Sequence, residues 1–205
     1  MDMSHCDWIY NVLEGKKETE LRVFENEHFM LQKDWKFNEG DDLKSLYCLA
    51  ITKRRDLHTI RDLTAADLPM LKSILAESIP AMTAMFKVPA CQITAYFHYQ
   101  PTYYHMHVHF VHVEKVFPSS KNCVDLATVI FNLELSGDYY QKAPLSYKVG
   151  NLHPLYEVLV EKDVLPKVVV EEKVEVKEVV KEEEVVEKKE EVIEVAETKE
   201  PDTTE

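Results

Sequence analysis

The sequence predicts an α+β fold, an antiparallel sheet with flanking helices, followed by a low-complexity tail. Short apolar runs and one long amphipathic stretch are mixed along the chain without the strict βαβ alternation of a doubly wound sheet. From about Val164 the composition changes to Val, Glu and Lys, with no aromatic residue. We therefore place one domain at residues 1–160 and an acidic tail at residues 161–205.

The N-terminal elements follow from capping and turn signals. Asp7 is expected to cap a helix from Trp8 to about Glu14, which Gly15 ends. Two apolar runs at residues 21–24 and 29–32 flank a four-residue polar connection and predict a hairpin.

The middle of the chain contains a loop, a central strand and the longest helix. The polar residues 34–42 predict the loop, and the continuous apolar run 46–51 predicts a strand buried on both faces. Thr64 and Asp67 resemble a capping box before a helix whose apolar residues recur every three or four positions up to Phe86. Four more elements are expected: a strand from Cys91 to about Tyr99, a strand from near Tyr103, a helix at 125–133 and a helix at 152–160.

The tail has two competing patterns. Residues 174–176 alternate like a strand, whereas Val179, Val186 and Ile193 lie seven apart like a helix. Its low complexity and high charge favour a disordered or transiently helical segment. A coiled-coil helix that binds a partner is the alternative.

The charge is uneven and excludes some classes of protein. Residues 161–205 hold 17 of the 37 acidic residues but only 8 of the 24 basic ones, so the domain itself is close to balanced. Such a domain lacks the basic face of a duplex-DNA binder, and no run approaches the roughly 20 apolar residues of a membrane span. The four dispersed cysteines indicate reduced thiols, and the first residues do not form a signal peptide. We expect a cytoplasmic protein, with the nucleus as a second location.

The most informative motif is a run of alternating histidines. On a strand, His105, His107 and His109 would share one face while the intervening apolar residues face the core. Three imidazoles in a row predict either a metal site or a site where one imidazole attacks phosphorus and its neighbours orient and stabilise. Nothing else in the sequence completes a zinc site, so we favour the metal-independent phosphoryl chemistry.

With these residues the chain resembles the histidine-triad superfamily and, more narrowly, the scavenger mRNA-decapping enzymes. The motif His-x-His-x-His followed by apolar residues is present at 105–111. Four further segments carry the narrower resemblance, at residues 8–13, 23–26, 54–57 and 61–64.

The resemblance implies a histidine-triad-like sheet and hydrolysis of the triphosphate bridge of 7-methylguanosine cap dinucleotides or short capped RNA. The products would be methylguanosine monophosphate and a nucleoside diphosphate or diphosphate-ended oligonucleotide. It also implies a homodimer without cofactor or metal, acting on neither DNA nor membranes.

The resemblance assigns roles to ten residues. His107 would be the nucleophile, flanked by His105 and His109. Trp8 would stack on the methylated base and Glu18 would accept hydrogen bonds from the guanine edge. Asp34 and Lys36 would complete the cap pocket, and the phosphate bridge would contact His98, Thr102 and Tyr103.

Each of these pocket residues has an ordinary alternative as a core or solvent-facing side chain. Arg54, Arg55 and Arg61 suggest an RNA patch, but we favour structural pairing with Asp56 and Asp62.

Two departures from the family are visible. The family carries an N-terminal domain that closes over the cap, and the sequence matches from the catalytic domain onward. The family also has a basic residue after the histidine strand, for which Lys121 is the candidate. Two alternatives therefore stay open: a lidless cap-binding protein with little turnover, and a general histidine-triad nucleotide hydrolase.

Overall fold

The computed structural model describes residues 6–34, 37, 40–115, 122–151 and 153–166. It divides into two compact units, Met1–Lys148 and Val149–Glu205. The described part of the second unit contains helix α5 (Pro154–Glu161). No helix in the described ranges is long and apolar enough to cross a membrane. The predicted boundary after residue 160 stays a prediction, and the tail from residue 167 lies outside the described residues.

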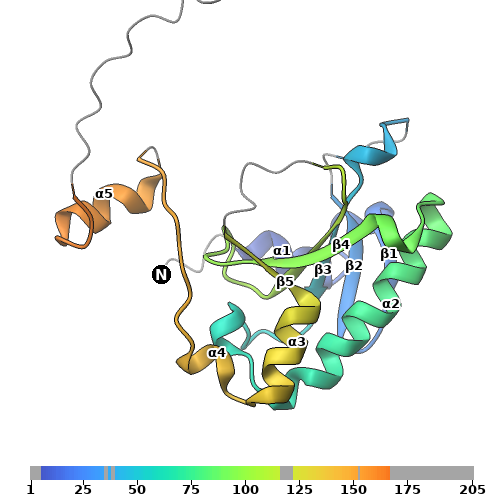
Figure 1. The fold of residues 1–205 in the computed structure, drawn as a ribbon. Coiled ribbons are helices and arrows are strands. Elements are labelled where there is room, and N and C mark those ends of the chain that lie inside the picture. Colours follow the sequence, from blue (N-terminus) through green and yellow to red (C-terminus); the bar gives the residue numbers. More distant parts are fainter. Residues whose placement is uncertain (1–5, 35–36, 38–39, 116–121, 152, 167–205) are drawn as a thin grey trace, which may run out of the picture. The chain divides into compact units, whose positions relative to one another are not determined.

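The first unit is built on a six-stranded antiparallel sheet with the order β1-β2-β3-β5-β4-β6 (Figure 1). Its strands are β1 (Arg22–Glu25), β2 (Phe29–Lys33), β3 (Tyr47–Thr52), β4 (Ile93–His98), β5 (His107–His112) and β6 (Cys123–Asp125). The α+β class with an antiparallel sheet is confirmed. The strand β6 was not expected from the sequence.

Four α-helices belong to this unit, and five short 3-10 turns lie between the elements. The helices are α1 (Asp7–Leu13), α2 (Leu68–Phe86), α3 (Leu126–Leu135) and α4 (Tyr139–Lys142). The 3-10 turns are Thr19–Leu21, Leu43–Ser45, Ile60–Asp62, Ala65–Asp67 and Ala90–Gln92.

The predicted hairpin is confirmed, and one side chain shapes its turn. The Asn26 Oδ1 accepts hydrogen bonds from the backbone N–H groups of His28 (2.8 Å) and Phe29 (3.0 Å). Its Nδ2 donates to Ser73 (2.9 Å) and Glu77 (3.0 Å) on α2. The asparagine therefore sets the turn geometry and ties the hairpin to the long helix.

The capping residues predicted from the sequence are present at the ends of α1 and α2, except at the start of α1. The capping box before α2 is present, because the Asp67 carboxylate accepts from the backbone N–H of Thr64 at 2.8 Å. Gly15 follows α1 with a left-handed φ of 69°, as expected for the residue that ends a helix. Asp7 does not cap α1, since it is the first helical residue and Cys6 occupies the cap position without a side-chain bond.

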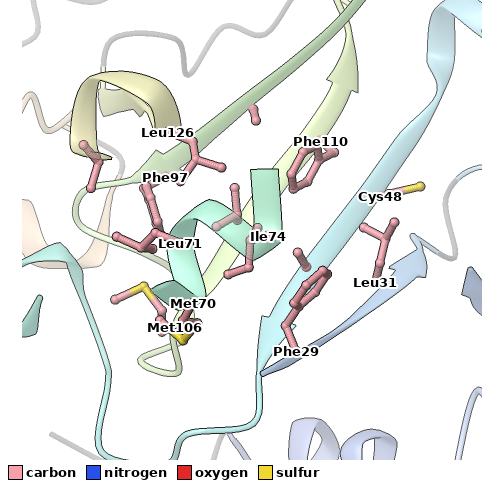
Figure 2. Close-up of a cluster of buried hydrophobic side chains, with 14 of the residues drawn as sticks. Phe29, Leu31, Cys48, Met70, Leu71, Ile74, Phe97, Met106, Phe110 and Leu126 are labelled. Atoms are coloured by element: carbon pink, nitrogen blue, oxygen red, sulfur yellow. The ribbon is translucent and has the colours of Figure 1, made fainter. Parts of the chain in front are cut away.

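The main core lies between one face of the sheet and the helices α2 and α3. Figure 2 shows Leu71 and Ile74 of α2 gathered with Phe29, Phe97 and Phe110 of the sheet. All five are at most 2% exposed. Burial of each such side chain stabilises the fold by about 1.5–3 kcal/mol.

The other face of the sheet is only partly covered. Ile9 and Val12 of α1 pack on Met30 and Ile51 in a smaller apolar cluster. Tyr47 and Leu49 of β3 stay half-buried on this face, so the expected burial of β3 on both faces is wrong. The incomplete cover leaves room for a site.

Candidate active site

The uncovered part of the sheet face holds a cavity of about 500 Å³. Eight of the ten residues assigned from the sequence line it: Trp8, Glu18, Asp34, His98, Thr102, Tyr103, His107 and His109. Lys36 and the candidate basic residue Lys121 lie outside the described residues. His105 is described but does not line this cavity.

Strand register explains why residues distant in sequence meet here. Gln32 on β2 pairs with Leu49 on β3, and Leu49 pairs with His109 on β5. Met30, Ile51 and His107 form the next such row. Neighbouring strands are about 4.8 Å apart, so Gln32 and His109 are separated by about 10 Å across the sheet.

The ring of His107 is fixed in one tautomer by its surroundings. Its Nδ1 lies 2.7 Å from the carbonyl oxygen of His105. A carbonyl can only accept, so Nδ1 carries the proton and Nε2 keeps its lone pair. Burial lowers the pKa of His107 to about 4, although the bond to the carbonyl acts in the opposite direction. The imidazole is therefore neutral and nucleophilic at pH 7.

His109 is held between two tyrosine rings. Tyr47 stacks on one side at 5.6 Å and Tyr96 on the other at 5.2 Å between ring centroids. The Tyr47 hydroxyl lies 2.6 Å from Nδ1 of His109. Burial, reinforced by His107 and His98, lowers the pKa of His109 well below its ordinary value. Its Nε2 is buried without a hydrogen-bond partner among the described residues, which leaves it available to a ligand.

His98 brings a third imidazole to the cavity from the end of β4. Its ring meets that of His109 edge to face, with 4.4 Å between centroids. Burial lowers the pKa of His98, so this ring is also neutral at pH 7. The cluster that lines the cavity therefore consists of His98, His107 and His109.

The side chain of His105 does not line the cavity with the other two. The strand begins only at His107, and His105 precedes it with its side chain 1% exposed. Its Nε2 donates to the backbone oxygen of Thr52 at 2.8 Å, and its ring packs edge to face on Tyr10. The His105 side chain supports the structure, while its backbone carbonyl orients His107.

The opposite end of the cavity is suited to a flat base. The indole of Trp8 meets the ring of Tyr103 edge to face at 5.4 Å. Glu18 lines the same cavity and has a left-handed backbone conformation with φ 55°. Its carboxylate accepts a hydrogen bond from Gln32 Nε2 at 3.1 Å. An aromatic face and a carboxylate can together hold a cationic purine that presents hydrogen-bond donors.

Comparison with known proteins identifies the family. A profile described as "Scavenger mRNA decapping enzyme C-term binding" matches residues 7–124, more than half of the chain.

This chain belongs to that family.

Three relatives with sequences similar to this scavenger decapping family member share the same name. The "m7GpppX diphosphatase" of Ascaris suum is 39% identical over 156 residues, which cover 73% of this chain and 52% of the relative. The protein of the same name from Caenorhabditis elegans is 40% identical over 77% of this chain and 52% of its own length. That from Homo sapiens is 37% identical over 75% and 47%. The chain thus spans about half the length of the curated relatives it matches.

Among solved structures, aprataxin ortholog Hnt3 in complex with DNA superposes with a TM-score of 0.47. It is 15% identical and covers 78% of this chain and 94% of its own. The fold assignment of this decapping family member stands instead on its strand order and the family match.

Three polar residues that line the cavity of this scavenger decapping family member were not expected from the sequence. Gln32 and Tyr47 were assigned to apolar strands, and Lys17 was not singled out. The polar Gln32 inside an apolar strand was the available signal. Among the described residues, no three His, Cys, Asp or Glu side chains are grouped so as to hold a metal ion.

The three arginines have structural partners, as favoured, although only Arg54 pairs with an expected aspartate. Arg54 contacts Asp56 and, at 2.7 Å, Asp67. Arg55 lies 2.8 Å from Glu14 and over the ring of Tyr10.

Arg61 does not pair with Asp62. It donates instead to the backbone oxygens of Tyr140 (2.7 Å) and Ala143 (2.6 Å). The Asp62 carboxylate accepts from the backbone N–H groups of His58 and Thr59. These contacts use the arginines to join loops and helices of the domain.

Proposed function

We propose that this chain hydrolyses the triphosphate bridge of 7-methylguanosine cap dinucleotides or short capped RNA. The observation that carries the proposal is the fixed tautomer of His107 in a cavity that also holds Trp8 and Glu18. Family membership and the relatives named m7GpppX diphosphatase support it. The base would lie between Trp8 and Glu18, and the first phosphate would face His107.

The reaction would proceed in two displacements. The Nε2 lone pair of His107 attacks the phosphorus next to methylguanosine, and the bond to the bridging oxygen of the diphosphate breaks. The nucleoside diphosphate leaves with that electron pair. Water then attacks the phosphohistidine, releases methylguanosine monophosphate and restores neutral His107.

The neighbouring imidazoles would stabilise the charge that develops on the phosphoryl oxygens. Both His98 and His109 have lowered pKa values, so each ring is neutral and can donate one N–H. Preorganised donors in a site of low dielectric act without reorganisation during the reaction. Thr102 and Tyr103 line the same cavity and would contact the phosphate bridge.

The proposal extends to the setting of the reaction. We expect a homodimer that acts in the cytoplasm, with the nucleus as a second location, without a cofactor or metal. Light scattering on purified protein, with and without the methylated cap dinucleotide, would measure the assembly.

The direct test is hydrolysis of a methylated cap dinucleotide in the presence of a chelator. Wild-type protein should release methylguanosine monophosphate, and His107→Asn should lose at least about 10³-fold in kcat. His28→Asn is the matched control, because His28 lies on the hairpin turn and not in the cavity. Full activity of His107→Asn would refute the nucleophile. Tight binding of the cap without turnover by the wild type would leave a cap-binding protein.

A further inference from the structure

Gln32 is a buried amide that follows three apolar residues on β2. It is 2% exposed, and its strand neighbours Met30 and Leu31 are at most 1% exposed. Its partners across the sheet are Leu49 on β3, whose side chain offers no polar group, and Arg22 on β1, whose guanidinium donates to Glu25. Burial of an amide in such surroundings lowers stability unless its polar atoms form hydrogen bonds.

The side chain of Gln32 is oriented by Glu18. Its Nε2 donates to Glu18 Oε2 at 3.1 Å. The reverse orientation would place the amide oxygen against a carboxylate oxygen, and two acceptors repel. The amide oxygen is consequently buried without a hydrogen-bond partner among the described residues. The orientation that forms the bond to Glu18 therefore leaves a buried acceptor without a hydrogen bond, and this lowers the stability of the fold.

Glu18 depends on this bond for its orientation. It lies on the connection between α1 and β1, in a left-handed conformation that is unusual for a glutamate. No other hydrogen bond or ion pair to its carboxylate is formed within the described ranges. A carboxylate on such a connection can rotate, whereas Gln32 is held on strand β2 and is almost fully buried.

Orientation matters because of the chemistry of the proposed ligand. A guanine presents two neighbouring donors, N1–H and the 2-amino group. One carboxylate can accept both only when its two oxygens lie in the plane of the base. Trp8 sets that plane by stacking, so the rotation of the Glu18 carboxylate decides whether the second bond forms.

We propose that Gln32 is a positioning residue that fixes the Glu18 carboxylate in the base plane and so determines selectivity for guanine. This inference deepens the proposed function and rests on it for the identity of the ligand. Gln32 lies about 10 Å from His109 across two strand spacings, so it acts on base recognition and not on the phosphoryl step.

The first test is the substitution Gln32→Met, which keeps the length of the side chain and removes the donor. Binding of 7-methylguanosine monophosphate should weaken about tenfold, and KM for the cap dinucleotide should rise equally with kcat unchanged. Gln32→Glu should weaken binding further, because it places a second carboxylate beside Glu18. Leu31→Met is the control, since it alters the same strand on its opposite face.

A second measurement separates positioning from a structural role. The preference for 7-methylguanosine over 7-methylinosine monophosphate, which lacks the 2-amino group, should fall about fivefold in Gln32→Met. In a Glu18→Ala background the same substitution should have no effect on affinity, because the effects of coupled residues are not additive.

Three outcomes would overturn the inference. They are unchanged affinity in Gln32→Met, an unchanged guanine preference, and an equal loss with and without Glu18. These outcomes are distinct from failure of the proposed function. Wild-type protein that binds the methylated nucleotide but does not hydrolyse the cap would still report on Gln32 through the binding cycle.

Discussion

The two faces of the sheet are made by alternate residues of the same strands, yet they serve opposite purposes. Phe110 on β5 faces α2 and α3 and is fully buried in a dry apolar core. Its neighbour His109 faces the cavity with a nitrogen that has no hydrogen-bond partner among the described residues. One face is packed mainly with apolar side chains, and the other keeps polar groups that packing alone would not select. Burial of apolar side chains on the core face therefore offsets the loss of stability caused by the buried polar groups of the cavity face.

The largest effect is expected from the packed face. Phe110→Ala should reduce the free energy of unfolding by about 3–5 kcal/mol, because it leaves a cavity between the sheet and the helices. Urea unfolding followed by circular dichroism measures it. Phe131→Ala is the control, since this side chain is 62% exposed on α3 and should cost little. Equal losses of stability in the two variants would show that burial against the sheet does not account for the effect of Phe110.

The next effect is the pH dependence of stability that the cavity face imposes. The pKa of His107 is about 4 in the folded protein against 6.5 as its ordinary value. The unfolded chain therefore binds more protons between these values, and stability falls as the pH drops from 6.5 towards 4. The difference corresponds to about 3 kcal/mol for His107 alone.

Urea unfolding at pH 7.5, 6 and 5 measures this dependence. The pKa values of His98, His105 and His109 are lowered in the same direction, so they steepen the loss. His107→Asn should flatten the slope by removing one of the four groups. A slope that is the same in wild type and variant would contradict burial of the imidazole as its cause. The same pKa implies hydrolysis that persists below pH 6, unlike that of an ordinary histidine nucleophile.

A smaller effect separates the two histidines of the motif. His105→Ala should reduce the free energy of unfolding by about 2 kcal/mol, because the buried bond to Thr52 is lost. Its effect on kcat should be far smaller than that of His107→Asn, since alanine retains the backbone carbonyl that orients His107. Parallel unfolding and cap-hydrolysis assays test this. Equal losses of kcat in the two variants would show that the His105 ring itself takes part.

The smallest effect concerns the Tyr47 hydroxyl that contacts His109. Tyr47→Phe keeps the stacked ring and removes the partner of Nδ1, so kcat/KM should fall about tenfold while stability changes little. Steady-state kinetics with the cap dinucleotide measures it. Tyr156→Phe is the matched control, because this tyrosine lies in the second unit and its hydroxyl donates to the Pro166 carbonyl at 3.0 Å. Unchanged kinetics would leave Tyr47 with a packing role.

Local patterns predicted much of the fold and the resemblance predicted most of the site. The hairpin turn at Asn26 and the capping box at Thr64 are encoded within a few residues, and both formed as expected. Eight of the assigned site residues line one cavity. What local patterns do not contain is the order of the strands.

Gln32 and Tyr47 were missed for that reason. A continuous apolar run does not show which of its faces will be left uncovered, and β3 was therefore expected to be buried on both. Gln32 became part of the site only through its register with Leu49 and His109. His105 was expected to line the cavity because the alternating pattern extends two residues further than the strand itself.

The orientation of His107 by a main-chain oxygen has a consequence for how this site can change over generations. Every amino acid supplies the same carbonyl, so no codon change at position 105 can delete the group that orients the ring of His107. The tautomer of His107 thus depends on the backbone conformation at residue 105 and not on the side chain there. Mutational drift can reshape what the cavity admits while the attacking nitrogen keeps its lone pair.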